Sequence, residues 1–131
     1  MTQNEKDLLV KDLCGRLLYG VKCIEKTPIE DFKDKNLWEI DRVRADTFMF
    51  GMSNCYVCYG QYDDIHNIKP YLFPLDKISG DMWSKYLATC VGGNASFPTL
   101  KSFEWCNEHH VDYRGLIPMG LALDATGLNI Y

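Results

Sequence analysis

Two histidines, an acid and an arginine form the most polar cluster near a predicted helix end: His109, His110, Asp112 and Arg114. A hydrolase or a nucleotide-acting enzyme could use one histidine as general base, orient it with Asp112 and bind an anion with Arg114. No nucleophile stands at a recognisable spacing from the cluster. Each residue also has a structural explanation, because histidines are favoured at a helix C-terminus, Asp112 can cap the next helix, and Arg114 can pair with Asp112 or a carbonyl. We therefore expect a helix junction here, with catalysis as the alternative.

Two pairs of metal-binding residue types stand at a three-residue spacing, Cys55 with Cys58 and Cys106 with His109. Together they would supply the four ligands of a structural zinc site. Side chains three apart in a strand point to opposite faces, however, and no glycine-rich knuckle surrounds Cys55. A redox pair would need a helix N-terminus, whereas Cys55 and Cys58 lie in a β-prone run. We expect strand residues here, and no metal or other cofactor.

The composition indicates one small domain with no general affinity for nucleic acid or membranes. The chain has 131 residues, the usual size of a single domain, and its net charge of −4 disfavours general attraction to nucleic acid or anionic lipid. No apolar run approaches the roughly 18–20 residues that span a bilayer, and the first residues lack the layout of a signal peptide. We expect a cytoplasmic protein whose six cysteines are small buried hydrophobes.

Tyrosine is the most frequent aromatic residue, with eight copies against six Phe and three Trp. A tyrosine ring suits a half-exposed sheet or a binding face, because its large apolar surface ends in a hydroxyl that needs a partner when buried. The half-exposed sheet is the commoner reading. Should the face bind a ligand, the candidate residues are Tyr56, Tyr59, Tyr113 and Arg114.

Periodicity predicts an α+β domain covering residues 1–131. Leucines recur near the helical period over 5–17, with Asn4 and Asp7 as a capping pair and with Asp12 and Arg16 on the polar side. Apolar alternation with turns at about ten-residue spacing predicts an antiparallel β-meander over about 21–75. We expect the helices to pack on one face or end of this sheet, which could be strongly curved, as in Sm-like or SH3-like folds.

The last part of the chain, about 79–123, is predicted to hold two or three helices. Ser79 or Asp81 can cap the first of them, and Thr99 opens the next, over 100–110. A short final helix is expected to end at Gly120 in a left-handed cap, with Leu121 folding back onto it.

Three segments recur in order in a group of related proteins: 11–22, 68–75 and 105–117. By these segments the sequence resembles a family of small uncharacterised proteins encoded by gut Bacteroidales and their phages and mobile elements. The chain departs from the pattern at Pro118, which costs about 3 kcal/mol inside a helix, and over 80–98. The resemblance supplies no activity.

Two functions from different classes follow. The first is a non-enzymatic binding module of a phage or mobile element that acts on a host protein or small ligand, for example in counter-defence. It depends on the resemblance, the tyrosine-rich sheet and the missing catalytic set. The alternative is the small hydrolase or nucleotide-acting enzyme built on the 109–114 cluster.

Overall fold

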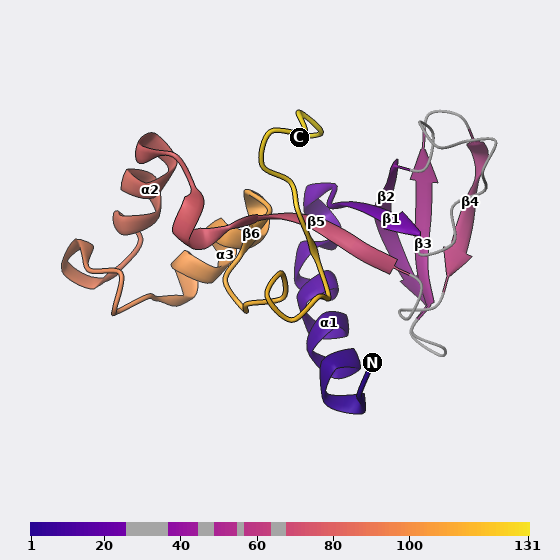
Figure 1. Ribbon diagram of the computed structural model, residues 1–131, viewed down its shortest axis with the longest axis horizontal. Coiled ribbons are helices and arrows are strands. Elements are labelled where there is room, and N and C mark those ends of the chain that lie inside the picture. Colours follow the sequence, from indigo (N-terminus) through magenta and orange to yellow (C-terminus); the bar gives the residue numbers. More distant parts are fainter. Residues whose placement is uncertain (26–36, 45–48, 55–56, 64–67) are drawn as a thin grey trace.

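The computed structural model describes residues 1–25, 37–44, 49–54, 57–63 and 68–131 (Figure 1). The chain has an N-terminal helix, a mixed sheet and C-terminal helices, so the predicted α+β class is confirmed. Its elements in chain order are α1 (Gln3–Arg16), the 3-10 helix η1 (Leu17–Tyr19), β1 (Lys22–Glu25), β2 (Leu37–Arg44), β3 (Met49–Asn54), β4 (Val57–Asp63), β5 (Ile68–Pro74), the 3-10 helix η4 (Leu75–Lys77), α2 (Gly80–Leu87), the 3-10 helix η5 (Val91–Gly93), α3 (Leu100–Glu108), β6 (Val111–Asp112) and β7 (Leu123–Asp124).

Helix α1 begins earlier than the sequence predicted, because Thr2 and not Asn4 caps it. The Thr2 hydroxyl accepts a hydrogen bond from the Glu5 backbone N–H at 3.2 Å, and the Glu5 carboxylate accepts one from the Thr2 N–H at 2.7 Å. This reciprocal pair satisfies two of the N–H groups that a helix start leaves without partners. The predicted pairing of Asn4 with Asp7 is therefore wrong, although the helix itself is confirmed.

The predicted antiparallel meander holds for the first four strands. Strand β1 pairs with β2, β2 with β3 and β3 with β4, each antiparallel, with register shifts in the last two pairings. A strongly curved sheet of the Sm or SH3 kind stays a prediction.

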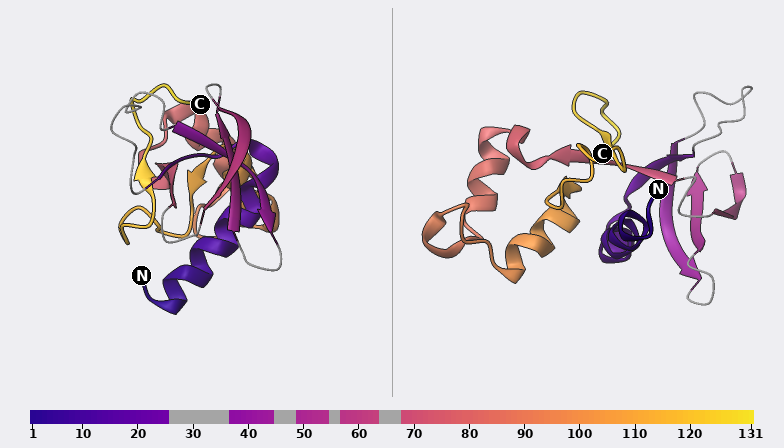
Figure 2. Two further views of the ribbon diagram at one scale, coloured as in Figure 1. Left: turned by 90° about the vertical axis from the view of Figure 1, so that its right-hand side faces the viewer. Right: turned by 60° about the horizontal axis from the view of Figure 1, so that its bottom comes forward.

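Strand β5 departs from the predicted meander and makes the sheet mixed. Its first half is antiparallel to β1, with Cys23 opposite Pro70. Its second half pairs in parallel with β7 at Tyr71 and Leu72, and with β6 at Phe73 and Pro74. As Figures 1 and 2 show, β5 therefore runs from the sheet to the part of the molecule that contains α2 and α3. The meander therefore ends at β4, because β5 lies beside β1, and the sheet departs from the predicted antiparallel arrangement where β5 pairs with β6 and β7.

The C-terminal helices follow their local signals closely. Thr99 caps α3 in a reciprocal pair with Ser102. The expected last helix is only a turn, but its end has the predicted geometry: Gly120 has φ 75°, its N–H donates to the Ile117 carbonyl, and the Leu121 N–H donates to that of Leu116. These two bonds define a Schellman motif. No helix within the described ranges is long and apolar enough to cross a membrane.

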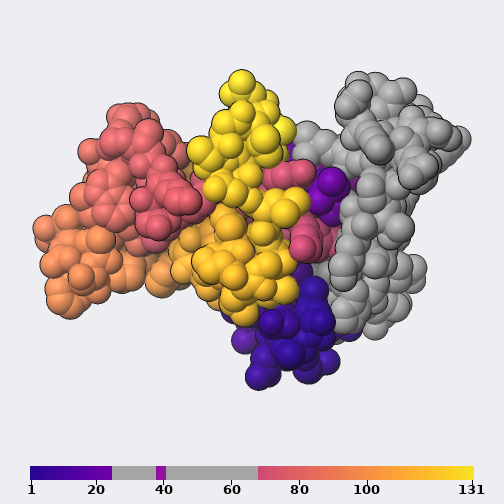
Figure 3. Space-filling model, in the orientation of Figure 1, coloured from indigo at the N-terminus to yellow at the C-terminus, as the bar shows by residue number. Residues whose placement is uncertain are grey.

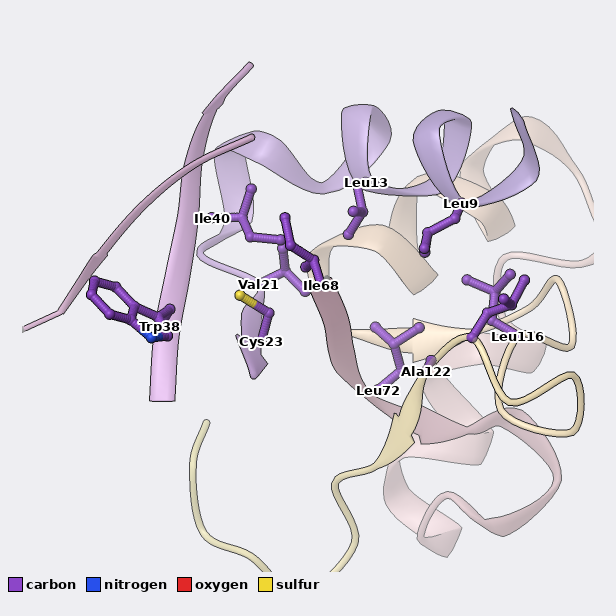
Figure 4. Packing of buried hydrophobic residues seen from close by; sticks show 11 residues of the cluster. Leu9, Leu13, Val21, Cys23, Trp38, Ile40, Ile68, Leu72, Leu116 and Ala122 are labelled. Carbon is purple, nitrogen blue, oxygen red and sulfur yellow. The ribbon is translucent and has the colours of Figure 1, made fainter. Parts of the chain in front are cut away.

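Buried apolar side chains form two clusters on either side of β5. The first joins α1 to the sheet and to the turn after β6 (Figure 4); its members include Leu9, Leu13, Ile40, Leu72 and Leu116. The second joins α2 to α3 through Tyr86, Cys90, Cys106 and Val111.

Candidate binding site at the Asp112 turn

The carboxylate of Asp112 organises the turn that follows β6. Its Oδ1 accepts hydrogen bonds from the backbone N–H groups of Arg114 (3.2 Å) and Leu116 (3.0 Å), and its Oδ2 accepts one from Ile117 (2.9 Å). Asp112 is 6% exposed. Both oxygens are thus occupied by backbone donors, and Asp112 caps the turn, as its position in the sequence suggested.

A cavity of about 450 Å³ opens against this turn. Its walls come from the end of β5 with η4, from α2, from the 112–118 turn and from β7. The lining is mainly apolar, with a tryptophan on one side, and it is made by Pro74, Leu75, Asp76, Lys77, Trp83, Asp112, Gly115, Ile117, Pro118 and Asp124. Its size and its apolar lining with a few polar groups are those of small-ligand sites.

A second cavity of about 320 Å³ shares Lys77 with the first. It is lined by Phe73, Lys77, Ile78, Ser79, Met82, Thr126 and Gly127. Strand β7 and the segment after it therefore contribute to both cavities, with Asp124 of β7 lining the larger and Thr126 with Gly127 lining the smaller. In Figure 3 the C-terminal segment, in yellow, lies on the surface beside the part of the molecule that contains α2.

Arg114 turns away from Asp112 and toward α1, where a buried ion pair lies. Arg16 and Asp12 have fully buried side chains, with Arg16 Nε 2.8 Å from Asp12 Oδ2 and the Arg16 Nη2 3.0 Å from Oδ1. Arg114 Nε lies 3.3 Å from the same Oδ1, close enough for an ion pair but outside hydrogen-bond geometry. The ion pair of Arg114 is thus with Asp12 and not with Asp112, which was one of its two expected partners, and the predicted placement of Asp12 and Arg16 on a polar face is wrong.

Arg16 also ties α1 to the 109–114 junction. Its guanidinium donates to the Cys106 carbonyl at 3.2 Å and to the Val111 carbonyl at 2.8 Å. The Tyr113 ring lies within cation–π reach of two guanidinium groups, with Arg16 Cζ at 5.6 Å and Arg114 Cζ at 4.9 Å from its centroid. Tyr113 and Arg114, candidates for ligand binding, thus stabilise the junction, and neither lines the two cavities.

The two histidines stack on different aromatic residues. His109 lies parallel to Trp105, 4.4 Å between ring centroids, with its Nδ1 2.9 Å from the Trp105 carbonyl. His110 stacks on Tyr131 at 3.6 Å and 11°. Neither ring has a hydrogen bond to a carboxylate among the described residues, so the pattern of a base oriented by Asp112 is not formed.

His110 is held as a neutral ring in a left-handed backbone conformation. Its φ is 60°, and its Nδ1 is buried with no hydrogen-bond partner among the described residues. Burial, together with the positive charges of Arg16, His109 and Lys22, lowers its pKa from 6.5 to about 4.

Sequence reasoning missed Tyr131 altogether. Its hydroxyl accepts a hydrogen bond from the Lys22 N–H at 2.7 Å and donates one to the Tyr71 carbonyl at 2.6 Å. Burial of this hydroxyl raises the pKa of Tyr131. No local pattern marks such a residue, because its partners lie 60 and 109 positions away along the chain.

Two of the metal-site candidates and two of the ligand-binding candidates come from residues 55–59. Cys55 and Tyr56 lie outside the described residues, while Cys58 and Tyr59 belong to β4, for which the backbone alone is described. Cys106 is fully buried, and burial raises the pKa of its thiol to about 12. Among the residues that the structure describes, no three His, Cys, Asp or Glu side chains are grouped to hold a metal ion.

The chain was compared with protein-family models, with curated proteins and with solved structures. None of the three comparisons gives a match. The geometry around Asp112 is therefore the basis for assigning a function.

Proposed function

We propose that the protein is a non-enzymatic binding module whose ligand enters the cavity beside the Asp112 turn. The observation that carries this proposal is the combination of a cavity of about 450 Å³ with a mainly apolar lining that includes Trp83 and Ile117. An aromatic or aliphatic group placed there would lose contact with water on several sides, which favours binding. The ligand is a small molecule or a segment of a host protein with such a group.

The contacts of the polar cluster favour binding over catalysis. Asp112 accepts three backbone hydrogen bonds, Arg114 pairs with Asp12, and the two histidines stack on Trp105 and Tyr131. A hydrolase would need these groups to face one reacting atom. Their existing contacts leave them structural roles instead.

The cellular setting of the module is part of the proposal. A net charge of −4 supports a partner other than nucleic acid. Origin in a phage or mobile element, action in the host cytoplasm and a counter-defence role depend on the sequence resemblance.

A neutral aromatic probe tests the proposed site directly. The protein, labelled with 5-fluorotryptophan, is titrated with benzyl alcohol, and the fluorine resonances of Trp38, Trp83 and Trp105 are followed by NMR. Only Trp83 lines the cavity, so we expect a saturable shift at Trp83 that exceeds those of the other two. Equal shifts at all three, or a linear response, would contradict the site.

Two neighbouring substitutions provide a matched comparison. Pro118→Phe places a ring in the lining of the cavity, whereas Met119→Phe adds a ring of the same size one residue away, on a side chain that does not line it. Both positions are exposed, so neither change disturbs the core. We expect Pro118→Phe to weaken benzyl alcohol binding at least several-fold and Met119→Phe to leave it unchanged.

A further inference from the structure

The ring of Tyr131 lies against two aromatic side chains from separate parts of the chain. It is parallel to His110 at 3.6 Å and tilted by 56° to Phe73 at 5.7 Å between centroids. Although Tyr131 is 40% exposed as a residue, its hydroxyl reaches the gap between β1 and β5. The side chain is thus held at both its ring and its hydroxyl.

The Tyr131 hydroxyl occupies the position of a missing rung in the β1–β5 ladder. The antiparallel register pairs Cys23 with Pro70, so Lys22 and Tyr71 would face each other next. There β5 turns to its parallel partners, and the hydroxyl bridges the Lys22 N–H and the Tyr71 carbonyl. Without it, these two backbone groups would lose their partner.

The segment between β7 and Tyr131 has a second attachment at its other end. The N–H of Ala125 donates to the Leu72 carbonyl at 2.9 Å, directly after the parallel pairing of β7 with β5. Thr126 and Gly127, which line the smaller cavity, lie between these two attachments, and Asp124, which lines the larger one, directly precedes the first. The position of this wall therefore depends on what fixes each end.

We propose that Tyr131 and His110 act as positioning residues that fix the wall formed by residues 124–127, which contributes Asp124 to the larger cavity and Thr126 with Gly127 to the smaller one, and so set ligand affinity without touching the ligand. This inference rests on the proposed function of the larger cavity. The path from this clamp, made by Tyr131 and His110, to the site is short. Tyr131 fixes the segment over β1 and β5, Thr126 and Gly127 of that segment line the smaller cavity, and Asp124 of the adjoining β7 lines the larger one.

Two variants break the clamp at different points. Tyr131→Phe keeps the stacked ring and removes only the bridging hydroxyl. His110→Asn removes the stacked ring but suits the left-handed conformation at φ 60°, which asparagine tolerates better than most residues. Tyr19→Phe is the control, because Tyr19 is similarly exposed (38%) and lines neither cavity.

The measurements separate the position of the wall from ligand affinity. For each folded variant, NMR gives the amide exchange rates of Lys22 and Ala125, the amide shifts of Thr126 and Gly127, and the benzyl alcohol affinity at Trp83. We expect Tyr131→Phe and His110→Asn to shift the wall amides, to speed exchange at Ala125 and to weaken binding about three- to tenfold. Tyr131→Phe alone should speed exchange at Lys22 directly, because it removes the acceptor of that N–H.

The outcomes also distinguish the two proposals. Unchanged wall amides in both variants would overturn the clamp, and shifted wall amides with unchanged affinity would overturn its effect on binding, while the cavity would remain a site. If the wild-type protein bound no benzyl alcohol, the proposed function and the affinity role would both fail. The exchange rates would then still decide whether Tyr131 and His110 hold the wall.

Discussion

Asp12 and Arg16 stand one helical turn apart on α1 and form an ion pair in which neither side chain is exposed. Arg16 also donates to two carbonyls at the 106–111 end of α3 and β6. A buried pair of this kind contributes less through its own attraction than through the cost of leaving one charge behind. Replacing one member alone should therefore lower the free energy of unfolding more than replacing both.

Arg16→Met is expected to lower the free energy of unfolding by about 3 kcal/mol, because it leaves the Asp12 carboxylate buried without its main partner. The double variant with Asp12→Leu should regain part of this loss, since neither buried charge then remains; Arg114 also loses Asp12, but its side chain is 30% exposed. Urea denaturation measures both. Lys85→Met is the matched control: Lys85 and Asp81 have the same spacing on α2 and a 3.3 Å separation, but both are exposed. That control should cost less than about 0.5 kcal/mol, and equal losses at Arg16 and Lys85 would contradict the role of burial.

The free energy of unfolding should decrease as the pH is lowered from the unfolded toward the folded pKa of His110. Its pKa is about 4 in the folded chain against 6.5 ordinarily, so between these values the unfolded chain binds a proton that the folded chain does not. The free energy of unfolding should therefore decrease between pH 7 and pH 5, by up to about 2 kcal/mol. His110→Asn should remove this loss. An equal loss in the variant and the wild-type protein, measured by urea denaturation at both pH values, would show that other groups cause it.

Asp112→Asn tests the turn that forms one side of the cavity. The amide group replaces one acceptor oxygen by a donor, so at least one of the three backbone N–H groups of Arg114, Leu116 and Ile117 loses its partner. We expect a loss of about 1–3 kcal/mol in the free energy of unfolding, from thermal or urea denaturation. Asp81→Asn, which changes an exposed acid on α2, should have little effect. A loss below about 0.5 kcal/mol at Asp112 would mean that its cap does not organise the turn.

The charges around the larger cavity predict a preference for cations. Its lining holds three acids, Asp76, Asp112 and Asp124, against one base, Lys77. Benzylamine should bind more tightly than benzoate by about fivefold, which corresponds to roughly 1 kcal/mol. The difference should shrink at high salt, because surface charges are screened. Asp76→Asn should reduce the preference and Asp81→Asn should not; tighter binding of benzoate would contradict the prediction.

The sequence predicts local structure well where the hydrogen-bonded groups are close along the chain. Thr99 as the cap of α3 and Gly120 with Leu121 at the last turn both appear as expected, because the atoms involved are at most five residues apart. The four-strand meander also follows from alternation and turns. The parallel pairings of strand β5 could not be predicted, because its partners β6 and β7 are two residues each and show no periodic pattern in the sequence.

The site depends on contacts that the sequence could not reveal. Asp12 and Arg16 look like an exposed pair until the carbonyls of Cys106 and Val111, 90 and 95 positions beyond Arg16, are placed beside them. Their four-residue spacing did allow an ion pair. The direction of Arg114 likewise depends on α1. A cavity is a property of packing, and its lining here comes from four separated segments.

Intermolecular nuclear Overhauser effects between benzyl alcohol and the wild-type protein test the central claim most directly. The aromatic protons of the probe should show contacts to the Ile117 methyl groups and to the Trp83 ring. These two side chains line the cavity from different elements, the 112–118 turn and α2. Contacts confined to exposed apolar side chains remote from the cavity, such as Val91, Phe97 and Leu100, would contradict a binding site beside the Asp112 turn.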